Sequence, residues 1–204
     1  MRAPVGVILA GGQARRMGGG DKGRLPLGGV PILTRVIARL EPQVAGLALN
    51  ANGDPDRFDD LGLDVLPDSV ADHPGPLAGV LAGLDWAAEQ GADHIVTAAA
   101  DTPFFPCDLV PMLQLAAERA GAPIALAATM EGTRQVRHPV FGLWPVALRE
   151  DLRLAIAAGT RKVVIWTGRH GAVEAVFPVE RFDPFFNVNT PDDLARAHSF
   201  LDAP

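Results

Sequence analysis

A glycine-rich, cationic segment near the N-terminus offers the clearest chemistry in this sequence. Residues 11–23 contain six glycines and the cations Arg15, Arg16 and Lys22, and they follow the apolar run 5–10. Because glycine permits backbone conformations that other residues avoid, successive N–H groups can turn toward one anion. The apolar run is typical of a buried strand. A strand that leads into such a loop is suited to binding a polyphosphate.

This loop differs from two common phosphate-binding motifs. The dinucleotide fingerprint is G-x-G-x-x-G, but here Gly12 directly follows Gly11. The P-loop has glycine directly before lysine and Ser or Thr after it, whereas Asp21 precedes Lys22 and Gly23 follows it. A plain flexible turn is the alternative, but such a turn takes about two to five residues. We therefore interpret the segment as a phosphate loop of another type.

Polar side chains follow three further predicted strands. Asp101 comes after the apolar run 94–100, Asn50 after residues 46–49 and Asp68 after residues 64–66. Ligands of open α/β sheets bind beyond the carboxyl ends of the strands, so we expect these side chains to share a crevice with the loop. Asp101 could hold Mg²⁺, which takes oxygen ligands and shares them with substrate phosphates. The alternative is that Asp101 caps the turn after it.

Asn50 and Asp68 suit the nucleoside part of a nucleotide. An amide can hydrogen-bond a base edge, and a carboxylate can accept from guanine N1–H and N2–H or from ribose hydroxyls. Either residue could instead shape a turn. Gly79 lies in the first turn of a predicted helix, where glycine costs about 1 kcal/mol relative to alanine. We interpret it as room for a planar base to approach the backbone.

Strand and helix patterns alternate along most of the chain. Strands are predicted at 5–10, 46–49, 64–66, 94–100, 123–128, 140–144 and 172–177. Helices are predicted at 31–40, 76–89, 109–120 and 149–158 and from Pro191, with a turn at 130–133. This alternation predicts an α/β fold in three layers, with a mostly parallel sheet and a late antiparallel portion. We expect one domain, 1–204, in which residues 1–128 bind the nucleotide and residues 129–204 contribute a second-substrate site.

Composition limits the class of protein. The chain has 204 residues, of which 48% are hydrophobic, and a net charge of −6. This charge argues against a general nucleic-acid binder, because such proteins usually present a basic surface. The sequence has neither an apolar run long enough for a membrane span nor a signal-peptide pattern, so we expect no membrane partner. Cys107 is the only cysteine, which favours a cytoplasmic protein.

The motifs together resemble a known family. They are LAGG at 9–12, RMGG at 16–19, DK at 21–22, NAN at 50–52, PDS at 67–69, GPLAG at 75–79, DTP at 101–103 and NVNTP at 187–191. In this order they are similar to the MobA family of molybdenum cofactor guanylyltransferases, from about Val5 to Leu194. The first motif alone indicates only the wider nucleotidyltransferase superfamily. The resemblance implies a Rossmann-like nucleotidyltransferase fold.

The resemblance also implies a reaction and its residues. The terminal phosphate of molybdopterin, or of Mo-molybdopterin, attacks the α-phosphate of GTP, so that GMP is transferred and pyrophosphate leaves. The GTP contacts implied are Leu9, Ala10, Gly11, Gly12, Lys22, Asn50, Asp68 and Asp101. Asp101 would also bind Mg²⁺, while Lys22 and Arg16 would neutralise charge that builds during displacement. Proteins that insert molybdenum or mature molybdoenzymes are the implied partners.

Elementary chemistry agrees with this reaction. The nucleophile is a phosphate monoester with a second pKa of about 6, so it is largely dianionic at neutral pH and needs no general base. Positioning and charge neutralisation should therefore dominate. We expect the second substrate at His138, at Arg161 and Lys162, and at Asn187 and Asn189. His138 could instead pack beside a strand, the two cations could be a solvated helix start, and the asparagines could only shape a turn.

Three other functions stay open at this point. A molybdenum cofactor cytidylyltransferase would share these motifs, and a sugar-1-phosphate nucleotidyltransferase would share the first of them. A GTP-binding module without catalysis is the alternative from a different class, against which Lys22 and Asp101 argue.

Overall fold

The protein folds around one seven-stranded sheet. A computed structural model describes residues 2–11, 22–70 and 75–201, apart from the side chain of Lys22. The strands of the sheet are β1 (Val5–Leu9), β4 (Leu47–Asn50), β5 (Asp64–Leu66), β6 (His94–Ala99), β7 (Ala125–Glu131), β8 (Arg134–Pro145) and β9 (Val173–Phe177). Their order is β5-β4-β1-β6-β8-β7-β9.

The sheet is parallel except around β8. Strand β1 pairs in parallel with β4 and β6, β4 with β5, and β7 with β9. Strand β8 runs antiparallel to both of its neighbours, β6 and β7. The prediction of a mostly parallel sheet with a late antiparallel portion is therefore confirmed.

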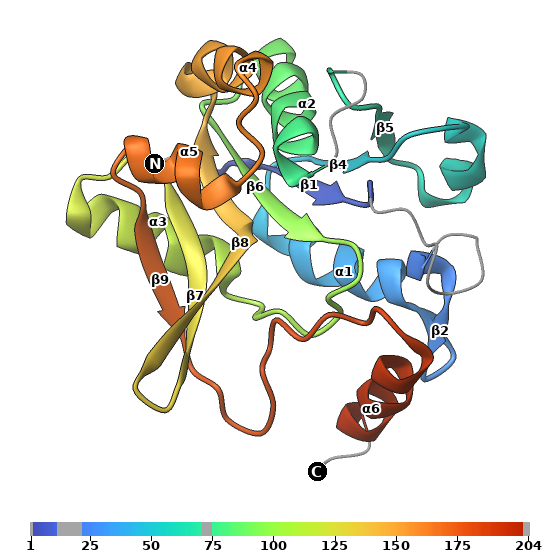
Figure 1. Ribbon diagram of the computed structural model, residues 1–204. Coiled ribbons are helices and arrows are strands. Elements are labelled where there is room, and N and C mark those ends of the chain that lie inside the picture. The colour runs from blue at the N-terminus through green and yellow to red at the C-terminus, as the bar shows by residue number, and fades with distance from the viewer. Residues whose placement is uncertain (1, 12–21, 71–74, 202–204) are drawn as a thin grey trace.

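Helices cover both faces of the sheet (Figure 1). They are α1 (Ile32–Leu40), α2 (Pro76–Glu89), α3 (Leu109–Ala120), α4 (Arg149–Ala157) and α5 (Val163–Arg169). Helices α1 and α3 share one core with Ile8 of β1, and α2, α4 and α5 share the other with Val7. Neighbouring strand residues point to opposite faces, so β1 contributes to both cores. The three-layer arrangement is that expected from the sequence.

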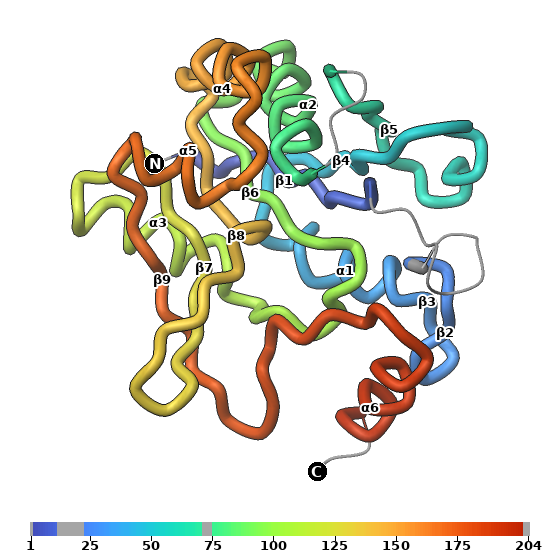
Figure 2. Tube along the Cα trace, in the orientation of Figure 1, coloured from blue at the N-terminus to red at the C-terminus, as the bar shows by residue number. Residues whose placement is uncertain are grey.

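A third, smaller core is formed where the last helix lies near strands β2 (Pro26–Leu27) and β3 (Val30–Pro31) (Figure 2). It lies between the hairpin of these two strands and the last helix, α6 (Pro191–Leu201). Helix α6 begins as predicted, since the Thr190 Oγ1 accepts from the Asp193 N–H at 3.1 Å. The Asp193 carboxylate in turn accepts from the Thr190 N–H at 2.9 Å. These reciprocal bonds form a capping box.

The late part of the chain differs from the sequence-based expectation. Strand β7 ends at Glu131 and β8 begins at Arg134, so the turn between them is shorter than the predicted 130–133. Strand β8 is much longer than the predicted 140–144. The added part of β8 is mostly polar, with exposed and half-buried residues, so it has no apolar run that would reveal a strand. Helix α5 corresponds to the helix start that was only an alternative at Arg161 and Lys162, and the β2–β3 hairpin was not predicted. None of the described helices is long and apolar enough to span a bilayer.

Candidate nucleotide-binding site

The carboxyl ends of four neighbouring strands form the candidate site. The hydrogen-bond ladder continues past these ends: the Ala10 N–H donates to Asn50 O at 2.9 Å, and the Ala100 N–H to Leu9 O at 3.1 Å. Asn50 is the last residue of β4, and Asp68, Gly11 and Asp101 follow β5, β1 and β6, so the four lie along the edge in the order Asp68, Asn50, Gly11, Asp101. Three strand spacings of about 4.8 Å give this edge a width of roughly 14 Å. A base, a sugar and the first phosphate can lie across it.

Asn50 and Asn52 hold the carboxylate of Asp68 from two sides. The Asn50 Nδ2 donates to Asp68 Oδ1 and to Leu66 O, each at 3.0 Å. The Asn52 Nδ2 donates to Asp68 Oδ2 at 2.7 Å. Both amide hydrogens of the buried Asn50 are thus used within the protein, so its amide orients Asp68. A direct contact of Asn50 with GTP stays a prediction. A carboxylate accepts about four hydrogen bonds, so Asp68 keeps capacity for a ligand.

Gly79 makes room for Asn50, a role that the sequence did not reveal, while the approach of a base to its backbone stays a prediction. Gly79 is buried in α2. A Cβ at this position would lie 2.2 Å from the Asn50 Oδ1 and 3.0 Å from the Leu9 Cδ2. The missing side chain therefore makes room for the amide that holds Asp68.

The late NVNTP segment lies beside Asp101. The Val188 N–H donates to Asp101 O at 2.8 Å, and the Thr102 Oγ1 donates to Asn187 Oδ1 at 2.5 Å. Val188 is fully buried, whereas Asn187 is exposed and Asn189 half-buried. This alternation agrees with an extended segment that turns both asparagines away from the core. The tertiary structure thus brings them to the end of β6.

His138 is tightly packed on β8. Its ring stacks on Phe185 with a centroid distance of 4.4 Å, and its Nε2 lies 2.8 Å from Thr129 Oγ1. Burial lowers the pKa of His138 below its usual value, while the nearby Asp183 carboxylate acts in the opposite direction. These contacts support packing beside the strand; a contact of His138 with the second substrate stays a prediction.

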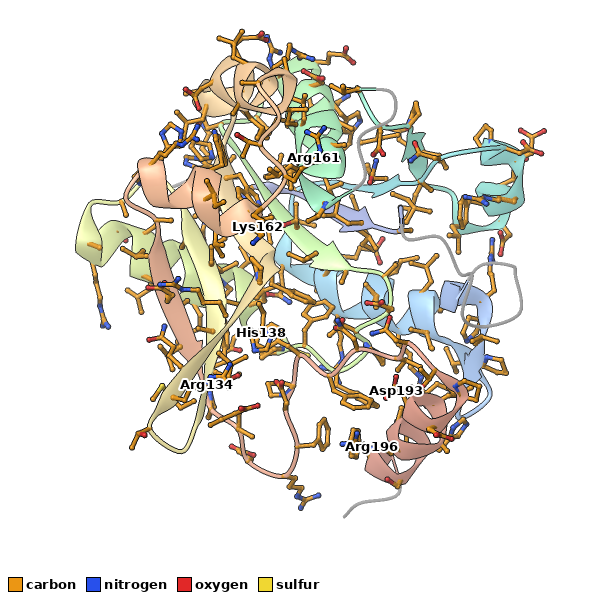
Figure 3. The ribbon with its side chains drawn as sticks, viewed as in Figure 1. Arg134, His138, Arg161, Lys162, Asp193 and Arg196 are labelled. Atoms are coloured by element: carbon orange, nitrogen blue, oxygen red, sulfur yellow. The ribbon has the colours of Figure 1, made fainter. Side chains whose placement is uncertain are left out.

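A cationic depression lies between α4 and α5. It has a volume of about 360 Å³ and is lined by residues 158–162, Ile165 and Arg169, so that Arg161 and Lys162 both border it. A Cβ on Gly75, just before α2, would lie 3.7 Å from Arg161 O. Figure 3 shows Lys162 between Arg161 and His138 in the view. Lys162 is the N-cap residue of α5 and Arg161 precedes it, in agreement with the helix-start alternative. Both also border a surface that could take an anion.

Some residues of the expected site lie outside the described chain. These are Gly12, Arg16 and the side chain of Lys22, whose backbone begins a short 3-10 helix, Lys22–Arg24. Among the residues that the structure describes, no three His, Cys, Asp or Glu side chains are grouped to hold a metal ion. A single carboxylate can hold Mg²⁺, because this ion usually retains waters and shares phosphate oxygens, so Asp101 stays the predicted ligand.

Comparison with known proteins shows the family of this chain. The family model of the MobA-like NTP transferase domain matches residues 6–173. The chain belongs to this family. A molybdenum cofactor guanylyltransferase of Cereibacter sphaeroides is 56% identical over 197 residues, which are 96% of each chain. The match to this MobA-like relative therefore includes the late NVNTP segment, which lies beyond the family model.

Solved structures share the fold of this MobA-like chain. The molybdopterin-guanine dinucleotide biosynthesis protein A of Archaeoglobus fulgidus has a TM-score of 0.72 and 26% identity, over 97% of this chain and 98% of that one. A 4-diphosphocytidyl-2C-methyl-D-erythritol synthase of Anaerococcus prevotii has a TM-score of 0.76 at 13% identity, over 98% of this chain and 96% of that one. The second likeness concerns the fold alone, since its identity is low.

Proposed function

We propose that the protein transfers GMP from GTP to molybdopterin, forming the molybdopterin guanine dinucleotide cofactor and releasing pyrophosphate. The observation that carries the proposal is the ordered edge of Asp68, Asn50, Gly11 and Asp101, in a chain similar along nearly its whole length to a molybdenum cofactor guanylyltransferase. Residues 1–128 would bind the nucleotide, and residues 129–204 would contribute to the acceptor site.

The nucleotide would lie across the edge from base to phosphate. Asp68 would accept from guanine N1–H and N2–H, because Asn50 and Asn52 present its two oxygens side by side. The backbone of Leu9, Ala10 and Gly11 would contact the nucleoside, and Gly12 and Lys22 would follow at the phosphates. Asp101, at the far end of the edge, would then face the α-phosphate.

Positioning and charge neutralisation would carry the chemistry. The acceptor phosphate is largely dianionic at neutral pH and can attack the α-phosphate without a general base. Asp101 would hold Mg²⁺, which would supply positive charge at the phosphates. Lys22 and Arg16 would stabilise the charge that develops as pyrophosphate leaves.

The acceptor would approach from the late segments of the chain. Asn187 and Asn189 lie beside Asp101, so they are placed to contact the acceptor near its reacting phosphate. Arg161 and Lys162 border the cationic depression, whose positive charge suits an anionic acceptor. His138 would act at the margin of this surface. Partner proteins that deliver or receive the cofactor, and a cytoplasmic location, stay predictions.

The test is a transfer assay with purified protein, molybdopterin and Mg²⁺. We expect pyrophosphate release and the dinucleotide product with GTP, and much less with ATP or CTP. Equal use of CTP would favour a cytidylyltransferase. GTP binding without pyrophosphate release would favour a module without catalysis, and product formed with a sugar 1-phosphate instead of molybdopterin would favour the sugar nucleotidyltransferases.

A further inference from the structure

We infer that Asn52 is a positioning residue that sets the selectivity of Asp68 for guanine. The inference rests on the proposed function, since it concerns how that site distinguishes bases. Asn52 is exposed, and nothing in its own burial requires an amide at this position. Its contacts with Asp68 are what give it a role.

Asn52 binds both the backbone and the side chain of Asp68. The Asp68 N–H donates to Asn52 Oδ1 at 2.9 Å, while the Asn52 Nδ2 donates to Asp68 Oδ2 at 2.7 Å. This pair of bonds closes a ring that only an uncharged amide can complete, because it needs an acceptor and a donor on one planar group. The ring fixes the rotation of the carboxylate as well as the course of the chain.

Asn52 is itself held in place from the core. The Arg57 Nη2 donates to Asn52 O at 2.7 Å, and the Arg57 guanidinium lies 4.7 Å from the ring centroid of the buried Phe58. Gly53 follows with φ +91°, a conformation that side chains rarely adopt. The loop after β4 is therefore held against Phe58 through Arg57, and through Asn52 it restrains the carboxylate of Asp68.

A fixed carboxylate matters for guanine in particular. Guanine presents two parallel donors, N1–H and N2–H, to one acceptor pair, whereas hypoxanthine has only N1–H and adenine has neither. Both oxygens of Asp68 must face the base together to use the second donor. Asn50 restrains Oδ1 and Asn52 restrains Oδ2. Without Asn52 the carboxylate can rotate, and the second bond should be lost more than the first.

Binding of GTP and ITP to the full chain tests this role. ITP differs from GTP only by lacking the N2 amine. The dissociation constant for ITP divided by that for GTP therefore reports the second bond. We expect Asn52→Ala to weaken the binding of GTP about tenfold, the factor expected for one hydrogen bond. The binding of ITP should be weakened much less. Asn52→Asp keeps the acceptor for the Asp68 N–H but opposes two carboxylates, so it should lower the ratio at least as much.

Ser69→Ala is the matched control. It removes the bond from Ser69 Oγ to Asp85 Oδ2, 2.6 Å long, in the same loop without touching the carboxylate of Asp68. We expect it to keep the wild-type ratio. A wild-type ratio in Asn52→Ala and Asn52→Asp, or an equal loss in Ser69→Ala, would overturn the inference alone. Wild-type protein that binds GTP no better than CTP and ATP would overturn the proposed function and this inference with it.

Discussion

Substituting Gly79 by alanine tests the arrangement that holds Asp68. The new Cβ would lie 2.2 Å from Asn50 Oδ1 and 2.9 Å from its Cγ, distances that no real contact sustains. The amide of Asn50 must therefore move, which breaks its two bonds to Leu66 O and Asp68 Oδ1. The same substitution adds a better helix former to α2.

The magnitudes decide which effect prevails. Two buried hydrogen bonds contribute about 2 kcal/mol together, and overpacking costs about 1–3 kcal/mol. Replacing glycine in a helix returns about 1 kcal/mol. We therefore expect Gly79→Ala to lower the free energy of unfolding by about 2–4 kcal/mol. For a chain of this size, this corresponds to a decrease in Tm of roughly 5–15 °C.

The assay combines thermal unfolding with GTP titration. Gly79→Ala should weaken the binding of GTP about tenfold, because Asp68 loses one of the bonds that orient it. Gly83→Ala is the control on the same helix. Its Cβ would press on Val7 Cγ2 at 2.8 Å and Ile95 Cδ1 at 3.1 Å. It should lower Tm without a change in GTP affinity, since only apolar atoms give way.

A double substitution isolates the contact. In an Asn50→Ala background the clash with the amide is removed and only the 3.0 Å approach to Leu9 Cδ2 remains. Gly79→Ala should therefore be much less destabilising there than in the wild-type background. An equal loss of stability in both backgrounds would refute the assignment of Asn50 as the group that needs Gly79. Unaltered GTP affinity in Gly79→Ala would refute the link from Asn50 to the nucleotide.

Three further outcomes follow from the site. Asp101→Asn should abolish pyrophosphate release in Mg²⁺ while Tm is kept, and near wild-type turnover would contradict its role. Lys22→Ala should lower kcat by about 10²–10³, whereas an unaltered kcat with a higher KM would make Lys22 a ground-state binder only. Because burial lowers the pKa of His138, the unfolded chain takes up a proton near pH 6.5 before the folded chain does. The free energy of unfolding should therefore fall as pH falls from about 6.5 toward the lower pKa of the folded state. Urea unfolding across this range should show a larger fall in the wild-type protein than in His138→Gln. An equal pH dependence in both proteins would contradict this expectation.

Local elements with strong signals could be predicted from the sequence. Helices α2 and α3 have the expected bounds, because Pro76 suits a first helical turn and Gly121, with φ +62°, ends α3. The buried parallel strands are continuous apolar runs. By contrast, the β2–β3 hairpin is only two residues on each side, and Gly28-Gly29 was its one turn signal. The polar half of β8 gave no apolar pattern to follow.

The sequence by itself determined which chemistry is available. The glycine-rich cationic loop, the polar residues that follow the strands and the order of the motifs are all local features, so they predicted the nucleotide site, the α/β fold and the family. Hydrophobic periodicity and residue type carry this information without knowledge of distant contacts.

Only the tertiary structure decided how these residues work together. Thr102 binds Asn187, 85 positions away, and Gly79 accommodates the buried amide of Asn50. No local pattern encodes such pairs, because a buried polar group must find its partners wherever the packed chain provides them. Asn52 belongs to the NAN motif, but nothing local shows that it completes the ring with Asp68. The physical reason is that hydrogen-bond satisfaction and close packing are properties of neighbours in space, which folding selects and sequence spacing does not show.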